Sequence, residues 1–211
     1  MKFSEQLWQD NQTLYQKMYQ HPFNQKLADG TLELDIFKRY LIQDAQYLVA
    51  YGKALALAST KAWTTADMLQ CLSQAHVAVV FEKSLHDDFM TRFNITEQQP
   101  QSTACHHYCN FILATAWSES YPVILATLLP CFWVYASLGQ AFKITADHPY
   151  KTWIETYTDP EFITTVNTMK TALDTVATQS DARTKQRMQE HFTWAMQLEL
   201  NFWESAYSNS Q

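Results

Sequence analysis

Cys131 has the strongest potential for covalent chemistry of any side chain in this sequence. It follows Pro130 in an apolar segment, and its thiolate form is a strong nucleophile, with an ordinary pKa of about 8.5. If a helix, or the second half of one, starts at this proline, the local amide dipoles favour the anion. A buried structural thiol is the simpler interpretation, because apolar burial raises the pKa of a cysteine.

Asp44 and Glu199 are carboxylates at positions where apolar side chains are expected. Asp44 falls within the apolar stripe of a long predicted helix, and Glu199 stands between Leu198 and Leu200. A buried carboxylate without a partner is energetically costly, so the two together indicate a polar pocket inside a helical bundle. Either one alone is explained equally well by exposure to solvent or by a structural hydrogen bond.

Aromatic residues share predicted helix faces with these three polar groups. Residues three or four positions apart lie on the same side of a helix, and each polar group has an aromatic neighbour at that spacing. The pairs are Asp44 with Tyr47, Cys131 with Tyr135, and Glu199 with Phe202. Aromatic rings beside a polar group can stack on a flat ligand, although most aromatic residues are expected in the core.

Metal and nucleotide chemistry have weak support in the sequence. Helical di-iron proteins carry Glu-x-x-His motifs, and this chain has none. Glu82 and His86 could together ligate one metal, with His76 as a weaker addition, but a solvated helix face explains them more simply. No glycine-rich phosphate-binding loop is present. We therefore expect neither a metal nor a cofactor.

The elements that position these groups are predicted to be helices. The 211 residues include only 3 glycines and 6 prolines, whereas all-β folds need many turns that use both residue types. A chain that is 47% hydrophobic can bury one substantial core. The formal net charge is -6 and no basic run occurs, which argues against binding to nucleic acid.

Apolar periodicity and capping signals divide the chain into successive helices. The expected ranges are about 4–19, 22–29, 34–61, 65–93, 103–118, 121–145, 149–157, 160–179 and 181–206, with a bend expected at Pro130 if the helix is interrupted there. No repeat, low-complexity tract or linker separates them. The prediction is a single all-α domain over residues 1–211.

Residues 120–142 contain no charged side chain and are long enough to suggest a membrane span. Pro130 interrupts the segment, while Thr127, Ser137 and Gly139 dilute it. A helix buried on all sides within the domain is therefore the stronger interpretation. The N-terminus has no apolar signal-peptide core, so we expect a cytoplasmic protein with reduced cysteines and no contact with membranes.

Five segments in order along the chain resemble the TenA (thiaminase II) family. They are HPFNQKLADGTL from His21, YLIQDAQYL from Tyr40, LLPCFWVY from Leu128, WIETY from Trp153 and ELNFWESAY from Glu199. Together they are specific and cover nearly the whole chain. The resemblance implies an all-α, haem-oxygenase-like helical bundle that assembles as a homotetramer.

The resemblance also implies roles for individual residues. Cys131 matches the catalytic nucleophile of the cysteine-bearing branch, Glu199 the acid/base, and Asp44 the aspartate that hydrogen-bonds an aminopyrimidine. The aromatic matches around the substrate are Tyr47, Tyr135, Tyr157 and Phe202. A further pocket tyrosine of the family falls on Tyr108 by counting back from the cysteine, while a slip of one residue would place His107 there, rotated by about 100° around the helix.

The implied reaction is the hydrolysis of thiamine-derived aminopyrimidines. The products would be hydroxymethylpyrimidine and ammonia from aminomethylpyrimidine, or pyrimidine and thiazole from thiamine. One alternative is a pyrimidine-binding or regulatory protein that kept the fold and lost turnover. A more remote alternative is a haem-oxygenase-like metal oxidase that uses Glu82 and His86.

Overall fold

The computed structural model describes residues 1–93, 95 and 99–208, apart from the side chains of residues 81–90. Within these residues the chain forms α-helices and no strand, which confirms the predicted all-α class. The helices are α1 (Phe3–Asp10), α2 (Gln12–Gln20), α3 (Pro22–Asp29), α4 (Leu34–Lys61), α5 (Thr65–Arg92), α6 (Thr103–Ser118), α7 (Tyr121–Ala141), α8 (Lys151–Thr156), α9 (Pro160–Thr178) and α10 (Ala182–Ser208).

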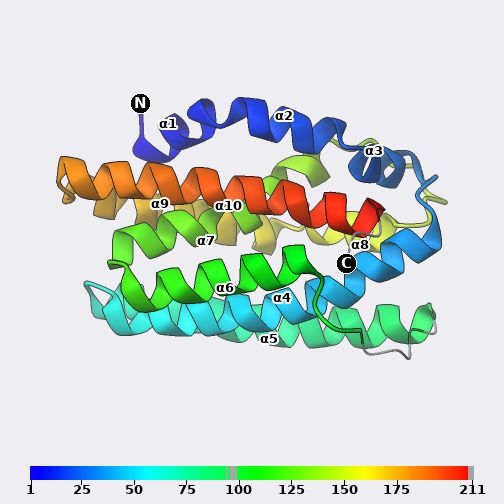
Figure 1. The fold of residues 1–211 in the computed structure, drawn as a ribbon, viewed down its shortest axis with the longest axis horizontal. Coiled ribbons are helices and arrows are strands. Elements are labelled where there is room, and N and C mark those ends of the chain that lie inside the picture. Colours follow the sequence, from blue (N-terminus) through cyan, green and yellow to red (C-terminus); the bar gives the residue numbers. More distant parts are fainter. Residues whose placement is uncertain (94, 96–98, 209–211) are drawn as a thin grey trace.

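The long helices run along the longest dimension of the molecule (Figure 1). α4 and α5 lie side by side along one edge, and α10 packs against α7 towards the opposite edge. α7 occupies the centre, because it contacts α4, α6, α9 and α10. Any side chain near the middle of α7 is therefore surrounded by the other long helices.

Local signals explain several helix ends. The His21 side chain accepts a hydrogen bond from the backbone N–H of Phe23, and Pro22 occupies the first turn of α3, where its missing N–H costs nothing. Gly30 ends α3 in the left-handed conformation, with φ of 80°. The Asp159 carboxylate caps α9 by accepting from the Glu161 N–H at 2.8 Å.

Three predicted boundaries are wrong. The expected helix over 4–19 is two helices, because the chain turns at Asn11, whose side-chain amide donates to the Leu7 carbonyl at 2.9 Å. The helix expected to reach residue 145 ends at Ala141, and α8 begins at Lys151 rather than residue 149. α7 itself continues through Pro130.

α7 is long and apolar enough to span a membrane by length and composition, and it is the one such helix in the described part of the chain. In its most apolar window, 78% of the residues are buried inside the protein. Helices pack against it on several sides. This packing supports the interpretation of residues 120–142 as a buried core helix.

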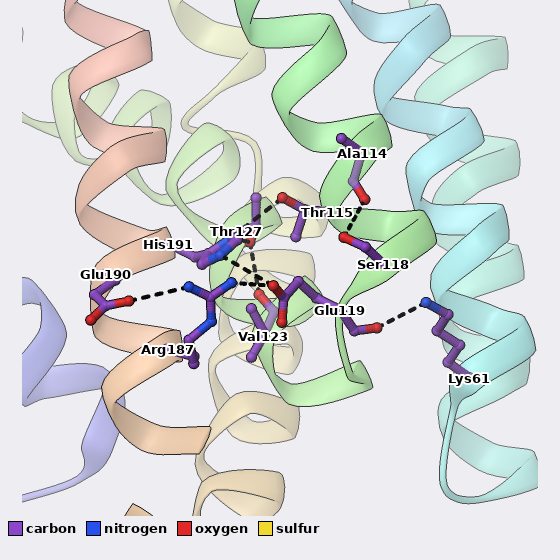
Figure 2. Close-up of polar contacts among 10 residues, drawn as sticks. All are labelled: Lys61, Ala114, Thr115, Ser118, Glu119, Val123, Thr127, Arg187, Glu190 and His191. Atoms are coloured by element: carbon purple, nitrogen blue, oxygen red, sulfur yellow. Dashed lines mark hydrogen bonds and ion pairs between the residues drawn. The ribbon is translucent and has the colours of Figure 1, made fainter. Parts of the chain in front are cut away.

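A polar cluster joins α6, α7 and α10 near the start of α7 (Figure 2). We call it the His191 cluster; it comprises Thr115, Glu119, Thr127, Arg187 and His191. The Nδ1 atom of His191 lies 3.3 Å from the Thr115 hydroxyl and 3.4 Å from the Thr127 hydroxyl. Its Nε2 atom lies 3.8 Å from the Glu119 carboxylate, which also pairs with Arg187. Burial, followed by the nearby Arg187 charge, lowers the pKa of His191.

Candidate active site

The three polar groups singled out in the sequence lie near one another in the bundle. Asp44 from α4 and Cys131 from α7 line the same cavity, which has a volume of about 460 Å³. Glu199 from α10 is buried close to Cys131, and its carboxyl group contributes to the raised pKa of that thiol. The bundle therefore gathers a thiol and two carboxyl groups from widely separated parts of the chain.

Glu199 is a buried acid with only 2% of its surface exposed. The hydroxyl of Tyr108 donates a hydrogen bond to Glu199 Oε1 at 2.9 Å. Burial raises the pKa of Glu199 to about 8; the Tyr108 hydrogen bond opposes this rise and the Asp44 charge adds to it. The side chain is thus mostly protonated at neutral pH and can give a proton to a bound ligand.

Cys131 is partly exposed, and it lines the cavity. Burial raises the pKa of the thiol well above its usual value, Glu199 raises it further, and the Tyr47 hydroxyl lowers it. The condition for a helix-dipole effect on this thiol is not met, because α7 begins at Tyr121, as predicted, and Cys131 lies in its interior. The terminal helix dipole therefore does not stabilise the thiolate here.

Tyr47 lies beside this thiol with its hydroxyl buried. The hydroxyl completes no hydrogen bond of ordinary geometry with a described residue, although it is close enough to Cys131 to affect the pKa of the thiol. The Tyr47 ring packs against Tyr108 at a centroid distance of 4.6 Å and against Phe202 at 5.9 Å. Tyr47, Tyr108 and Phe202 thus form an aromatic layer around Glu199 and Cys131.

Tyr135 and Tyr157 belong to the cavity wall, with ring centroids 5.0 Å apart. The Tyr40 hydroxyl donates to the Tyr135 hydroxyl at 3.0 Å, which fixes the orientation of that ring. The sequence assigned no role to Tyr40, although its place in the apolar stripe of α4 weakly indicated that it is buried. Its contact with Tyr135 spans helices far apart in sequence, which periodicity alone does not reveal.

The structure shows which of Tyr108 and His107 faces the interior of the bundle. Tyr108 is 1% exposed and contacts Glu199, whereas His107 points to solvent. The two residues differ by one position on α6, and that single step rotates one side chain inward and the other outward. The role of Tyr108 in binding a ring stays a prediction.

The metal hypothesis stays untested, because it depends on side chains that the structure does not describe. In the described residues, no group of three or more histidine, cysteine, aspartate or glutamate side chains could hold a metal ion. The side chains of Glu82 and His86 lie outside the described residues, and His76 is exposed.

The outer wall of the cavity was missed by the sequence analysis. It is formed by α8, the segment after it and the start of α9, and includes Glu155, Asp159, Glu161 and Phe162. Glu155 lies on the short helix α8, Asp159 precedes α9, and Glu161 and Phe162 lie in the first turn of α9, so no helical periodicity identified them as part of a site. Only the packing of α8 and α9 beside α7 brings them to the cavity.

Comparisons with known proteins agree with this geometry. Residues 8–209 match the TENA/THI-4/PQQC family. The aminopyrimidine aminohydrolase of Bacillus subtilis is 32% identical, over 98% of this chain and 90% of that protein. The thiamine biosynthesis multifunctional protein ThiED of Corynebacterium glutamicum is 33% identical, over 76% of this chain and 21% of that protein.

Among solved structures, the TenA homologue protein from P. horikoshii OT3 is similar over 100% of both chains, with a TM-score of 0.91 and 29% identity. The fold of the bundle is therefore shared with a TenA protein throughout its length. The family match covers both the segments that carry the polar groups and the aromatic layer between them. The chain belongs to the TENA/THI-4/PQQC family.

Proposed function

We propose that this protein is an aminopyrimidine aminohydrolase of thiamine salvage, and that Cys131 is its nucleophile. The observation that carries the proposal is that Cys131 and Asp44 line one cavity while Glu199 is buried close enough to both to interact with them electrostatically. The names of the B. subtilis and C. glutamicum relatives support an enzyme of this class and a link to thiamine metabolism. The proposed reaction converts aminomethylpyrimidine and water to hydroxymethylpyrimidine and ammonia.

The first step joins the sulfur of Cys131 to an electron-poor carbon of the pyrimidine ring. The electron pair displaced by this addition moves to the neighbouring ring nitrogen, which takes a proton from Glu199. A carboxyl group that stays protonated at neutral pH suits this role, and burial holds the pKa of Glu199 at about 8. The Glu199 carboxylate left behind can then accept the proton that the thiol gives up.

The second step breaks the bond between the exocyclic methylene carbon and its substituent. Electrons from the ring nitrogen, now in a non-aromatic ring, expel the substituent: ammonia leaves from an ammonium group, and neutral thiazole leaves from thiamine. Water then adds to the methylene carbon and releases a proton. The Cys131 sulfur then departs and takes up the proton held on the ring nitrogen, which restores the thiol and the aromatic ring and frees the hydroxymethyl product.

The remaining side chains hold the ring in place. Asp44 lines the cavity and can accept hydrogen bonds from the amino group of the pyrimidine. Tyr135 and Tyr157 present aromatic surface in the same wall, while Tyr47, Tyr108 and Phe202 surround the acid. Because this environment is largely apolar, each polar contact with the substrate is stronger than it would be in water.

The central test is the Cys131→Ala variant, assayed for ammonia release from aminomethylpyrimidine. We expect activity to fall to background, because no other described thiol lines the cavity, while the melting temperature stays close to that of the wild type. Cys109→Ala is the matched control, since it removes a buried thiol of α6 and leaves Cys131 in place. Full activity in Cys131→Ala would refute covalent catalysis by this residue.

A binding or regulatory protein of the same fold is the alternative from another functional class. Such a protein needs the pyrimidine pocket but not a nucleophile beside a protonated acid. Wild-type protein that binds aminomethylpyrimidine tightly and releases no ammonia would favour this alternative over the hydrolase. Monitoring thiazole in the same reactions decides whether thiamine is also cleaved.

We further propose that the protein acts as a cytoplasmic homotetramer. α5 carries apolar side chains exposed to solvent in the isolated chain, as expected for a surface that another copy covers. They are Leu69, Leu72, Val77, Val79 and Val80. All four cysteines are free, as in a reducing compartment. Light scattering after size-exclusion chromatography tests the tetramer, and cell fractionation tests the location.

A further inference from the structure

The cavity has an outer part that the pyrimidine chemistry does not use. Beyond Cys131 it continues along α8 and the start of α9. Its total volume of about 460 Å³ lies within the range of roughly 300–1,000 Å³ that is common for sites of drug-sized ligands. The site therefore has room for a pyrimidine ring together with a further group on its exocyclic methylene.

Aromatic rings form the inner border of this outer part. Phe162 of α9 packs against Phe132 of α7 at a centroid distance of 5.3 Å, and against Tyr157 edge-on at 5.2 Å. All three residues line the cavity. The electron-rich face of an aromatic ring attracts cations, and the attraction is largest where water is excluded.

Carboxylates form the outer border. Glu155 of α8, Asp159 after it and Glu161 of α9 line the cavity, with Asp44 deeper inside. Among the described lining residues there is no lysine, arginine or histidine. Lys151 provides a counter-charge at the exposed rim, where its Nζ lies 3.7 Å from the Glu155 carboxylate. A cleft lined by charges of one sign raises the local concentration of ligands of the opposite sign.

We propose that this outer compartment selects substrates by charge: it binds a cationic substituent on the pyrimidine methylene and rejects a substituent that carries phosphate. The cationic groups are an ammonium or a thiazolium ring, which would lie against Phe132, Tyr157 and Phe162. The inference rests on the proposed function for the identity of the pyrimidine, and adds the charge of the leaving group as a property that this chain discriminates.

The electrostatic preference acts on the substrate before bond cleavage. The ammonium and thiazolium groups are cations when they bind, and both leave as neutral molecules in the proposed second step. The leaving group still carries much of its positive charge when its bond begins to break, so the carboxylates stabilise the bound substrate and the transition state to a similar extent and influence KM more than kcat. They also repel a phosphorylated substituent at the rim before the ring reaches Cys131.

The test compares thiamine with thiamine monophosphate in a triple variant, Glu155→Gln, Asp159→Asn and Glu161→Gln. Asparagine at position 159 keeps an oxygen for the helix cap. We expect the ratio of kcat/KM for thiamine to that for thiamine monophosphate to fall by about tenfold, mainly through KM, because exposed charges each contribute modestly. An unchanged ratio would overturn the proposal.

A matched control removes three negative charges that do not line the cavity, with Asp10→Asn, Glu33→Gln and Asp35→Asn, all on the exposed surface. This control should keep the wild-type ratio, and an equal fall in both triple variants would mean that net charge rather than the compartment is responsible. Raising the salt concentration with wild-type protein should also lower the ratio, since salt screens exposed charges. The salt experiment uses only wild-type protein, so its result does not depend on whether a variant folds.

Binding separates failure of this inference from failure of the proposed function. Tryptophan fluorescence gives the Kd of thiamine and of thiamine monophosphate for wild-type protein and the acidic-rim variant, with no turnover needed. A preference for thiamine that the variant loses supports the compartment even if no ammonia is ever released. Equal Kd values for both ligands in wild-type protein would overturn the compartment even if the enzyme proves active.

Discussion

Two buried polar clusters stand on the same three helices and behave differently. Tyr108, Cys131 and Glu199 form one on α6, α7 and α10, and the His191 cluster forms the other. Tyr108 and Thr115 on α6, Cys131 and Thr127 on α7, and Glu199 and His191 on α10 are seven, four and eight residues apart, which places each pair on the same inward face of its helix. The difference therefore comes from the partners of each group and not from the elements that carry it.

The His191 cluster is satisfied by protein groups. The imidazole lies between two threonine hydroxyls and the Glu119 carboxylate, and Arg187 pairs with that carboxylate near the surface. Around Glu199, by contrast, no cation contributes to the pKa shift, and the neighbouring Tyr47 hydroxyl completes no ordinary hydrogen bond with a described residue. A buried polar group that can still form a hydrogen bond is suited to binding a ligand. A buried polar group whose hydrogen bonds are all made within the protein contributes to the stability of the fold.

Among the variants that compare these two clusters, Glu199→Gln is expected to have the largest effect, and that effect is on catalysis. Glutamine keeps an oxygen to accept from Tyr108 and loses the transferable proton. We expect kcat for ammonia release to fall by about 100-fold or more, with a smaller change in KM, as is typical for loss of an acid–base group. Steady-state kinetics measure both, and an unchanged kcat would remove the acid/base role.

The same variant should alter how stability depends on pH. The folded pKa of Glu199, about 8, lies above its ordinary value of 4.5, so the folded state holds the proton longer than the unfolded state. This contribution to stability is present below the ordinary pKa and is lost as pH rises through about 8. Thermal melts should show the melting temperature of Glu199→Gln rising relative to that of the wild type as pH increases from 5 to 9. A constant difference would contradict the raised pKa.

His191→Ala is expected to act on stability more than on catalysis. It leaves the Thr115 and Thr127 hydroxyls and the Glu119 carboxylate without the imidazole, at a cost of about 2–3 kcal/mol in the free energy of unfolding. We expect kcat/KM to change by less than about threefold when assayed well below the melting temperature. A loss of activity as large as that in Glu199→Gln would show that the two clusters function as one.

The pH dependence of the His191 cluster has the opposite sign. Burial lowers the pKa of His191, so the unfolded state binds a proton first as the solution becomes acidic. The stability that the neutral imidazole provides is therefore present above its ordinary pKa and is lost as pH falls. Melts below pH 7 should show the wild type losing its advantage over His191→Ala as the pH decreases.

The smallest expected effect concerns Tyr108 and His107. Tyr108→Ala should raise KM for aminomethylpyrimidine by about tenfold, through loss of aromatic surface beside Glu199. His107→Ala should change KM little, since this side chain is exposed. Tyr108→Phe separates the ring from the hydroxyl, because it keeps the aromatic layer and removes only the hydrogen bond to Glu199. The reverse order of the two alanine variants would contradict a pocket role for Tyr108.

The sequence predicted which segments form helices more accurately than it predicted the residues at which those helices begin and end. Apolar periodicity identified the long helices, and the Pro22 and Gly30 signals marked both ends of α3. It failed at Asn11, where a side-chain amide competes with the backbone, and it left open an interruption at Pro130, where α7 is continuous across a helix-breaking residue. At such places the local preference of the backbone opposes the packing of the helix in the core. Where the helix ends therefore depends on contacts with other segments of the chain.

The sequence by itself determined the all-α class, the family and the presence of a thiol and two carboxyl groups at apolar positions, because these depend on composition, spacing and ordered motifs. Only the tertiary structure decided that burial makes Glu199 a neutral acid, that α7 runs unbroken through Pro130 to Cys131, and that α8 and α9 bring carboxylates to the cavity rim. Each of these properties depends on the distance between residues far apart in the chain, since burial and electrostatic interaction are properties of the folded environment.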